Sequence, residues 1–387
     1  MNARERVLTA LNHKEPDRVP FDLGGTNVTG IQAKAYRRLR QYLGLPEMEL
    51  VMIDMDQQLA RVDDDVMQLL GCDARGVSPE PSSIYKLEVK ETADKRYCFY
   101  HDEYGIGWRM PTDGGLYYDM FDHPLSGEIT DASLEQYRMP DPKDPQRYVG
   151  LREKALKIIE KDACALVIGN MSAGIFEMYT WTRGFKDCFT DWAGNPPLAR
   201  KILNKFVDLQ LGYWESMFDC LKGIPIDVVK VGDDLGWQNG MLISPASYRK
   251  QLKPLHKIMF DFIHSKSDAK IFIHSCGSIR PVIADLIDVG VDILNPVQVS
   301  AVGMDSAELK RQYGKDVCFW GGGVDTQNAF DDRYTPAEVR ADVRKRLEDF
   351  MPGGGFIFST VHNIQGNVPP ENIIAMWETM REFGRYV

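Results

Sequence analysis

Two residues that bind metals well stand together at the end of a short apolar run. His274 and Cys276 follow the apolar residues 271–273, and Gly277 then permits a turn. In an extended chain alternate side chains share a face, so the imidazole and the thiol are presented side by side. A thiolate next to an imidazole favours zinc. Two ligands do not make a site, however, and the pair alone is also typical of a buried histidine and cysteine near a strand end.

A zinc ion that keeps one exchangeable position takes about three protein ligands, so a third ligand is expected downstream. Cys318 lies inside an apolar run, ahead of the glycines that end it, which indicates a structural role. His362 follows the last apolar run, and in an extended backbone it shares a face with the even-numbered residues 356–360. His362 then lies at the same end of the molecule as His274, where it either completes the metal site or contacts a substrate.

Six apolar segments alternate with helical patterns from residue 163 to the end of the chain. They span residues 165–170, 227–232, 270–274, 291–296, 317–321 and 355–359. Continuous apolar strands of this kind indicate a parallel sheet with helices on both faces. Two more strand candidates, 19–25 and 74–77, raise the number to eight and predict a (β/α)8 TIM barrel. The alternative is an open doubly wound sheet, but the glycine turn 23–26 lacks the dinucleotide-binding fingerprint.

The N-terminal third differs in character from the rest of the chain. Helical periodicity is predicted over residues 4–11, 33–43 and 56–70. Aromatic and polar residues joined by Gly and Asp turns follow between residues 84 and 124 and predict antiparallel hairpins. We therefore expect one barrel domain over residues 1–387, with a small hairpin insertion at about 84–124.

Polar residues gather where the predicted strands end, and in a barrel these ends meet at the mouth that carries active sites. Asp233 and Asp234 are adjacent carboxylates, which makes them candidates for general acid–base catalysis or for orienting a substrate. A helix cap or a turn is the alternative role for this pair. Asn170, Asn295 and Gln365 are candidates for substrate binding, although each is equally typical of a hydrogen-bonded loop.

Composition excludes several classes of partner. The formal net charge of -10 and the pI near 5.3 argue against nucleic acid or an anionic membrane as the main partner. No apolar run approaches about 18 residues, so no transmembrane helix is expected. Residues 1–7 show no apolar signal region. The 7 cysteines are scattered and odd in number, which does not suggest a disulfide framework. We expect a cytoplasmic protein with reduced thiols.

Several motifs taken together resemble the uroporphyrinogen decarboxylase superfamily over nearly the whole chain. The motifs are the opening segment 2–20 and the runs 232–236, 243–245, 274–277, 321–326, 362–365 and 369–372. The resemblance implies a (β/α)8 barrel, in agreement with the count of strands. It also implies one of two main activities, namely decarboxylation in the heme pathway or methyl exchange with a corrinoid cofactor.

The motifs of the two activities differ. The decarboxylases carry Arg-Gln-Ala-Gly-Arg after the first strand, and these arginines bind substrate carboxylates. Segment 22–28 has no arginine here, and the next one is Arg37. A tetrapyrrole with eight carboxylates needs strong cationic clamps, so this loss argues against that activity. The similar methyltransferases bind zinc through His-x-Cys and a distant second Cys. His274 and Cys276 match the first part, and His362 stands at the distant position.

The expectation from the sequence is a zinc-dependent methyltransferase that exchanges a methyl group between a small methylated substrate or thiol and a corrinoid. None of the seven histidines has the Asp-x-His spacing of corrinoid-binding domains, and all eight strand–helix units belong to the barrel. The cobalamin is therefore expected on a separate corrinoid-binding protein. Two alternatives stay open. One is a decarboxylase-type lyase for a different carboxylated substrate, and the other is a non-enzymatic barrel that binds a corrinoid protein.

Overall fold

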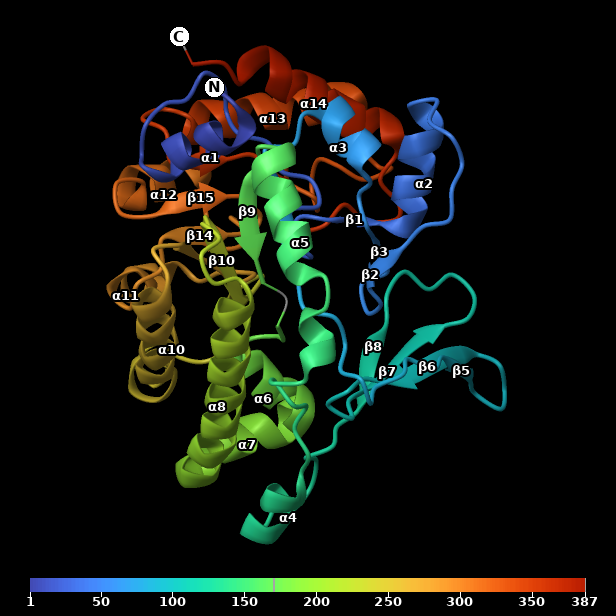
Figure 1. Cartoon of the computed structure of the whole chain (residues 1–387), viewed down its shortest axis with the longest axis vertical. Helices are drawn as coiled ribbons and strands as arrows, with labels where there is room; N and C mark the ends of the chain where they lie inside the picture. Colours follow the sequence, from blue (N-terminus) through green and yellow to red (C-terminus); the bar gives the residue numbers. More distant parts are fainter. Residues whose placement is uncertain (170, 387) are drawn as a thin grey trace.

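A parallel seven-stranded sheet that curls on itself forms the centre of the molecule. The computed structural model describes residues 1–169 and 171–386 (Figure 1). In spatial order the strands are β16 (Phe356–Ile357), β15 (Cys318–Trp320), β14 (Ile293–Asn295), β13 (Lys270–His274), β10 (Val228–Gly232), β9 (Ala165–Ile168) and β4 (Ala74–Val77). Each neighbouring pair is parallel. Gly232 lies opposite His274, and His274 opposite Asn295, so these strands end at one level.

An eighth segment closes the barrel between β16 and β4. Phe21 forms a parallel bridge with Phe358. The Asp22 N–H donates to the Phe358 carbonyl at 2.9 Å, and the Asp73 N–H donates to the Phe21 carbonyl at 2.8 Å. The predicted strand 19–25 is therefore shortened to a bridge around Phe21, because the chain turns directly after Asp22 and the Asp22 carboxylate accepts the Gly25 N–H. The (β/α)8 barrel that the sequence predicts is confirmed.

Helices follow the strands along the chain and cover the barrel. They are α2 (Ala33–Tyr42), α3 (Asp64–Leu70), α5 (Leu151–Leu156), α8 (Pro196–Cys220), α10 (Lys253–Lys266), α11 (Ile283–Asp288), α12 (Ser306–Tyr313), α13 (Pro336–Phe350) and α14 (Pro370–Phe383). Further elements occupy the connections. These are α4 (Asp131–Gln136), α6 (Ile175–Arg183), α7 (Phe185–Gly194), α9 (Pro245–Ser247) and the hairpin of β11 (Gly236–Trp237) and β12 (Gly240–Met241).

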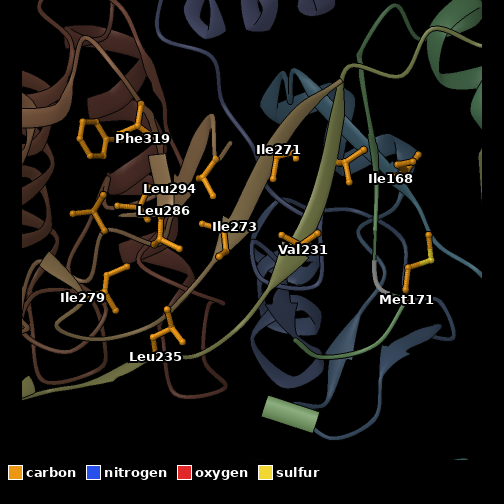
Figure 2. Close-up of a cluster of buried hydrophobic side chains, with 14 of the residues drawn as sticks. Ile168, Met171, Val231, Leu235, Ile271, Ile273, Ile279, Leu286, Leu294 and Phe319 are labelled. Carbon is orange, nitrogen blue, oxygen red and sulfur yellow. The ribbon is translucent and has the colours of Figure 1, made fainter. Parts of the chain in front are cut away.

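The alternation of side chains along each strand divides the apolar residues into two cores. Ile271 and Ile273 of β13 point outward and pack with Leu286 of α11 and other residues under the helices (Figure 2). Phe272, between them, points inward and belongs to the core that fills the barrel. This period of two fixes the inward face of β13, so His274 also points into the barrel, at its carboxyl-terminal end.

Helix α1 (Ala3–Leu11) seals the amino-terminal end of the barrel. Its buried residues Val7, Ala10 and Leu11 belong to the inner core. The capping box of Asn2 and Glu5 starts the helix. The termini and α1 lie at one end of the molecule, and the separate β5–β8 sheet lies toward the other end (Figure 1).

The hairpin insertion predicted for the N-terminal third is present. The strands β5 (Lys90–Glu91), β6 (Tyr97–His101), β7 (Gly107–Pro111) and β8 (Asp119–Asp122) form an antiparallel sheet in that order. The Trp108 ring meets the Trp181 ring of α6 edge to face, with 5.4 Å between ring centroids. This aromatic contact anchors the insertion to the helix that follows β9.

The helix predicted over 56–70 is wrong in its first half. Strand β3 (Leu59–Ala60) pairs antiparallel with β1 (Ile31–Gln32), and β2 (Met52–Asp54) lies on its other side. Leu59 and Ala60 are fully buried, so pairing and burial determine their conformation rather than helical period. The acidic residues 63–65 mark the start of α3, where negative charge stabilises a helix N-terminus.

None of the helices among the described residues is long and apolar enough to cross a membrane. All seven cysteines are free thiols.

Asp73 holds the closure of the barrel together. Its carboxylate is buried at the start of β4 and accepts the Phe21 N–H at 2.8 Å. It also pairs with Arg6 at 2.6 Å and with Arg18 at 2.7 Å. The carboxylate before β4 therefore joins helix α1, through Arg6, to the segment 18–21.

We predict that Asp73→Ala lowers the free energy of unfolding by about 3–5 kcal/mol, because it leaves two arginines without their buried partner. Urea denaturation measures the change. The matched control is Asp288→Ala, whose carboxylate pairs with Lys253 at 2.8 Å but is 71% exposed, and we expect the free energy of unfolding to change little there because solvent screens an exposed pair. Equal effects of the two substitutions would contradict this role of Asp73.

Candidate metal centre at the barrel mouth

Three good metal ligands converge at the carboxyl-terminal mouth of the barrel. One ligand atom from each of His274, Cys276 and His362 lies within 4.8 Å of the others. The Cys276 Sγ is 3.4 Å from the His274 Nε2, and the two imidazole centroids are 5.1 Å apart. His274 is the last residue of β13, whereas His362 arrives in the loop after β16. Zinc binds sulfur and nitrogen ligands at about 2.0–2.3 Å, and small side-chain movements would bring these three atoms onto one ion.

Backbone contacts hold Cys276 in place. Its N–H donates to the Asp234 carboxylate at 2.7 Å, and the next N–H, of Gly277, donates to the Gln298 side chain at 2.8 Å. Gly277 has φ +83°, and a Cβ there would lie 2.4 Å from the Trp237 nitrogen. Only glycine therefore permits this turn, and the turn positions the thiol over the end of β13.

Asn295 orients His274. The Asn295 Nδ2 donates to the Trp320 carbonyl at 2.7 Å, and its Oδ1 lies 2.6 Å from the His274 Nδ1. The imidazole then carries its proton on Nδ1 and leaves the Nε2 lone pair free for a metal. Asn295 is fully buried, with both polar groups engaged. The structure thus gives Asn295 a contact with His274, and its contact with a substrate stays a prediction.

His362 reaches the mouth by a route that the sequence did not predict. Strand β16 ends at Ile357, and the even-numbered Phe356 and Phe358 point outward under the helices. A fully extended chain would therefore have placed His362 on the outer side. Instead, His362 adopts a left-handed backbone with φ +65°, and the Thr360 hydroxyl donates to its carbonyl. Strained backbone of this kind is typical of functional sites.

Asn363, which the sequence analysis missed, fixes the loop that carries His362. Its Oδ1 accepts the Gly30 N–H at 2.6 Å. Its Nδ2 donates to the Asn27 carbonyl at 2.9 Å and to the Gln57 side chain at 2.8 Å. The side chain is fully buried. The loops near residues 27 and 57 thus hold His362 over β13, and no local motif signals contacts so distant in sequence.

The surroundings of the three ligands determine their protonation. Burial, with the positive charge of Lys230, lowers the pKa of His274 to about 3. Burial and the neighbouring His274 likewise lower the pKa of His362 to about 3. Burial, with the negative charges of Asp234 and Glu177, raises the pKa of the Cys276 thiol well above its usual value. Both imidazoles are therefore neutral and ready to bind a metal at physiological pH, and a bound dication would favour loss of the thiol proton.

The two predicted catalytic carboxylates have different surroundings. Asp233 is fully buried and accepts the backbone N–H groups of Phe176 and Glu177 at 3.1 and 2.8 Å, and the His256 Nε2 lies 2.8 Å away. Asp233 therefore caps the start of α6, which is the alternative role expected for the pair, and its catalytic role stays a prediction. Asp234 keeps 35% of its side chain exposed and lies 3.9 Å from the His274 Nε2. Burial is the main cause that raises the pKa of Asp234. Asp234 therefore stays a candidate for acid–base work.

The remaining predicted residues are placed as follows. Asn170 lies outside the described residues. The Gln365 amide donates to the Asn363 carbonyl at 3.2 Å, and its contact with a substrate stays a prediction. Cys318 is buried at the opposite end of the barrel, 3.7 Å from the Ala10 carbonyl of α1, as its structural role requires.

Two charged residues at the mouth were not predicted. Glu177 of α6 accepts the Gly174 N–H at 3.2 Å, and burial with the nearby charges of Asp234 and Asp233 raises its pKa well above the usual value. Lys230 is the one charged residue inside β10 and is buried. The sequence did contain a signal for Lys230. A charged residue inside an apolar strand is unusual, and the period of two places Lys230 on the inward face of β10.

We predict that stability falls at mildly acidic pH because of His274 and His362. An unfolded chain binds protons on these imidazoles below about pH 6.5, whereas the folded chain takes them up only near pH 3. The free energy of unfolding should therefore decrease as pH falls through this window, by up to about 1.4 kcal/mol per pH unit for each histidine. Urea denaturation measures the free energy of unfolding at pH 7 and pH 5. The decrease between these pH values should be smaller in the double variant His274→Gln/His362→Gln than in the wild-type protein. An unchanged pH dependence would contradict the prediction.

Comparisons with known proteins agree on the family. The family model described as Uroporphyrinogen decarboxylase (URO-D) matches residues 102–383. A uroporphyrinogen decarboxylase of Mannheimia succiniciproducens is 24% identical over 296 residues, which is 73% of this chain and 76% of the relative. One from Vibrio vulnificus is 26% identical over 301 residues, with the same coverage of both chains.

A solved structure shows the same fold over the whole chain. It is a methyltransferase from Methanosarcina mazei, with a TM-score of 0.65, 19% sequence identity and 99% of both chains covered. At this identity the likeness shows the barrel alone, and the chemistry has to be argued from the mouth.

Proposed function

Since the chain belongs to the uroporphyrinogen decarboxylase family, we propose that it is a zinc-dependent methyltransferase. It exchanges a methyl group between a small methylated substrate or thiol and a corrinoid cofactor that is carried on a separate protein. The observation that carries the proposal is the convergence of His274, Cys276 and His362 at the barrel mouth. Two imidazoles and one thiol form a donor set that suits zinc and leaves a fourth position for a ligand.

The residues around this donor set fit a metal. Asn295 fixes the tautomer and the angle of the His274 ring, as the hydrogen-bond partner of the second ring nitrogen does for a metal-bound histidine. The left-handed turn at His362 and the Asn363 contacts hold the third ligand. A bound zinc would supply either a stabilised substrate thiolate or a Lewis acid for the oxygen or nitrogen of a methylated substrate. Asp234 lies beside the donor set, where it can orient the substrate or move a proton.

Electrostatics at the mouth argue against the decarboxylase reaction on a porphyrinogen. In the decarboxylases the carboxylate-binding arginines follow the first strand, and in this chain the loop after Asp22 stands there. The Asp22 carboxylate accepts hydrogen bonds from Trp320 at 2.9 Å and from Gly25 at 2.8 Å. Asp234 and Glu177 add acidic groups beside the metal ligands. A substrate with eight carboxylates would meet these carboxylates without the cationic clamps that it needs.

We propose a separate carrier because the barrel takes up most of the described chain. The barrel accounts for the strands β4, β9, β10 and β13–β16 and the helices around them, and the other sheets of the described residues are small and antiparallel. A corrinoid would then have to reach the barrel mouth from outside, with its reacting atom close to the substrate. The β5–β8 sheet, which is anchored on α6, lies where it can form part of the rim for such an approach.

The metal is the first test of the proposal. We predict one zinc per chain in protein purified with zinc, measured by elemental analysis, and loss of this zinc in Cys276→Ser. Asn295→Ala should bind zinc about 10–100-fold more weakly, because the His274 ring loses its support. Cys318→Ser is the matched control and should keep its zinc. A chain that binds no zinc, or that loses it in Cys318→Ser, would contradict the proposed site.

The reaction is the second test. We predict that mixing the protein with corrinoid proteins, methyl donors and thiols changes the cobalamin spectrum, and that Cys276→Ser does not support the change. Uroporphyrinogen should not be converted to coproporphyrinogen. Turnover of uroporphyrinogen would support the decarboxylase alternative, and tight cobalamin binding by this chain alone would refute a separate carrier. No spectral change with any carrier would favour the non-enzymatic alternative.

A further inference from the structure

Lys230 is a buried lysine whose ammonium group has no hydrogen-bond or ion-pair partner among the described residues. It lies in the middle of β10, where its neighbours on both sides are valines. The residue is only 7% exposed. Among residues 1–169 and 171–386, no group makes a hydrogen bond or an ion pair with its ammonium group. Burial of an unpaired charge is costly, so a residue in this state is unusual unless it serves a purpose.

The neighbouring strands make room for Lys230 inside the barrel. A Cβ on Gly169 would lie 2.9 Å from the Lys230 Cβ and 3.3 Å from its Cδ, so the lysine stem occupies the space that a side chain would fill. On the other side, Lys230 lies opposite the inward-facing Phe272. Gly232, two residues further along the same face, lies opposite His274. Lys230 is therefore on the inward face of β10, one pleat below the level of the metal centre.

Charged groups from several elements face Lys230. Glu177 of α6, Asp54 at the end of β2 and Asp234 after β10 are the acidic groups, and each of them raises the pKa of Lys230. Burial outweighs them, and the pKa of Lys230 is lowered from its usual value. The positive charge of Lys230 in turn lowers the pKa of His274 and of His362.

We propose that Lys230 is the proton acceptor and donor for the substrate atom that gains or loses the methyl group. The inference rests on the proposed function and deepens it. It is carried by the position of the lysine beneath the donor set and by the absence of a protein partner among the described residues. It also requires that the substrate is a thiol, alcohol or amine, because these groups exchange a proton for a methyl group.

The proton and electron balance of the step is simple. In methyl acceptance, the S–H, O–H or N–H bond of the substrate breaks, its electron pair stays on the heteroatom, and the neutral Lys230 amine takes the proton. The heteroatom then bonds to the methyl group of the methylated corrinoid, and the electron pair of the cobalt–carbon bond stays on cobalt. In the opposite direction the reduced corrinoid takes the methyl group, and the ammonium of Lys230 gives its proton to the heteroatom.

A lysine suits this role when its pKa is near the working pH. General acid–base groups of this kind contribute about 10²–10⁴-fold to rate. An arginine keeps a positive charge but does not release its proton at these pH values, and a methionine keeps the length of the chain without the charge. Lys230→Arg and Lys230→Met therefore separate proton transfer from a purely electrostatic role.

The first experiment needs no substrate. The protein is labelled with ¹⁵N-lysine and loaded with zinc, and the Nζ signal that Lys230→Arg lacks is followed between pH 6 and pH 11. We expect this signal to titrate below the usual lysine pKa of about 10.4. A Lys230 that stays protonated up to the usual value would overturn the proposal, and this holds whether or not methyl transfer has been observed.

The second experiment measures methyl transfer with the corrinoid carrier. We expect Lys230→Arg and Lys230→Met to lose about 10²–10⁴-fold in rate and to keep one zinc per chain. Lys257→Arg is the control, because Lys257 is 58% exposed and pairs with Asp261. Activity in Lys230→Arg together with its loss in Lys230→Met would show that Lys230 anchors an anionic group, and it would overturn proton transfer. Activity in both variants would overturn it as well. If the wild-type protein binds no zinc or transfers no methyl group, the result counts against the proposed function instead.

Discussion

The candidate centre depends on one constraint, which is that the barrel must close. His274 and His362 are 88 residues apart in sequence, and they meet because β13 and the loop after β16 belong to one cylinder. Phe21 completes that cylinder through a single bridge to Phe358, and Asp73 ties the bridge to Arg6 and Arg18. The register of parallel strands then sets His274 level with Asn295, which orients the ring. Closure and register together position the donor set more than any local motif does.

Strong local signals made much of the barrel predictable. The strand Lys270–His274 has the predicted limits, because a continuous apolar run ends there in polar residues. The pair His274 and Cys276 was also accessible, since strand periodicity alone brings them together. Residues 56–60 were misread as helix because long-range pairing with β1 determines their conformation. Contacts of this kind leave little trace in a single sequence.

The path of His362 shows where sequence reasoning reaches the right place for the wrong reason. An extended chain was expected to carry it to the mouth, but the residues before it face the outer helices. A left-handed turn and the buried Asn363 reverse its direction. Asp233 and Asn295 were identified as polar strand-end residues, and both are fully buried, with Asp233 at the start of α6 and Asn295 against the His274 ring. Lys230 and Glu177 are missing from the predicted set, although they supply charge beside the donor atoms.

X-ray absorption at the zinc edge tests the metal centre, because it reports the number and type of atoms bound to the metal. We expect one sulfur at about 2.3 Å, two imidazole nitrogens at about 2.0–2.1 Å and one further light atom. Substitution of His362 should remove one imidazole from this spectrum and leave the sulfur. A spectrum without sulfur, a spectrum with two sulfurs, or a spectrum that His362→Ala leaves unchanged would contradict the assignment of His274, Cys276 and His362 as the metal centre.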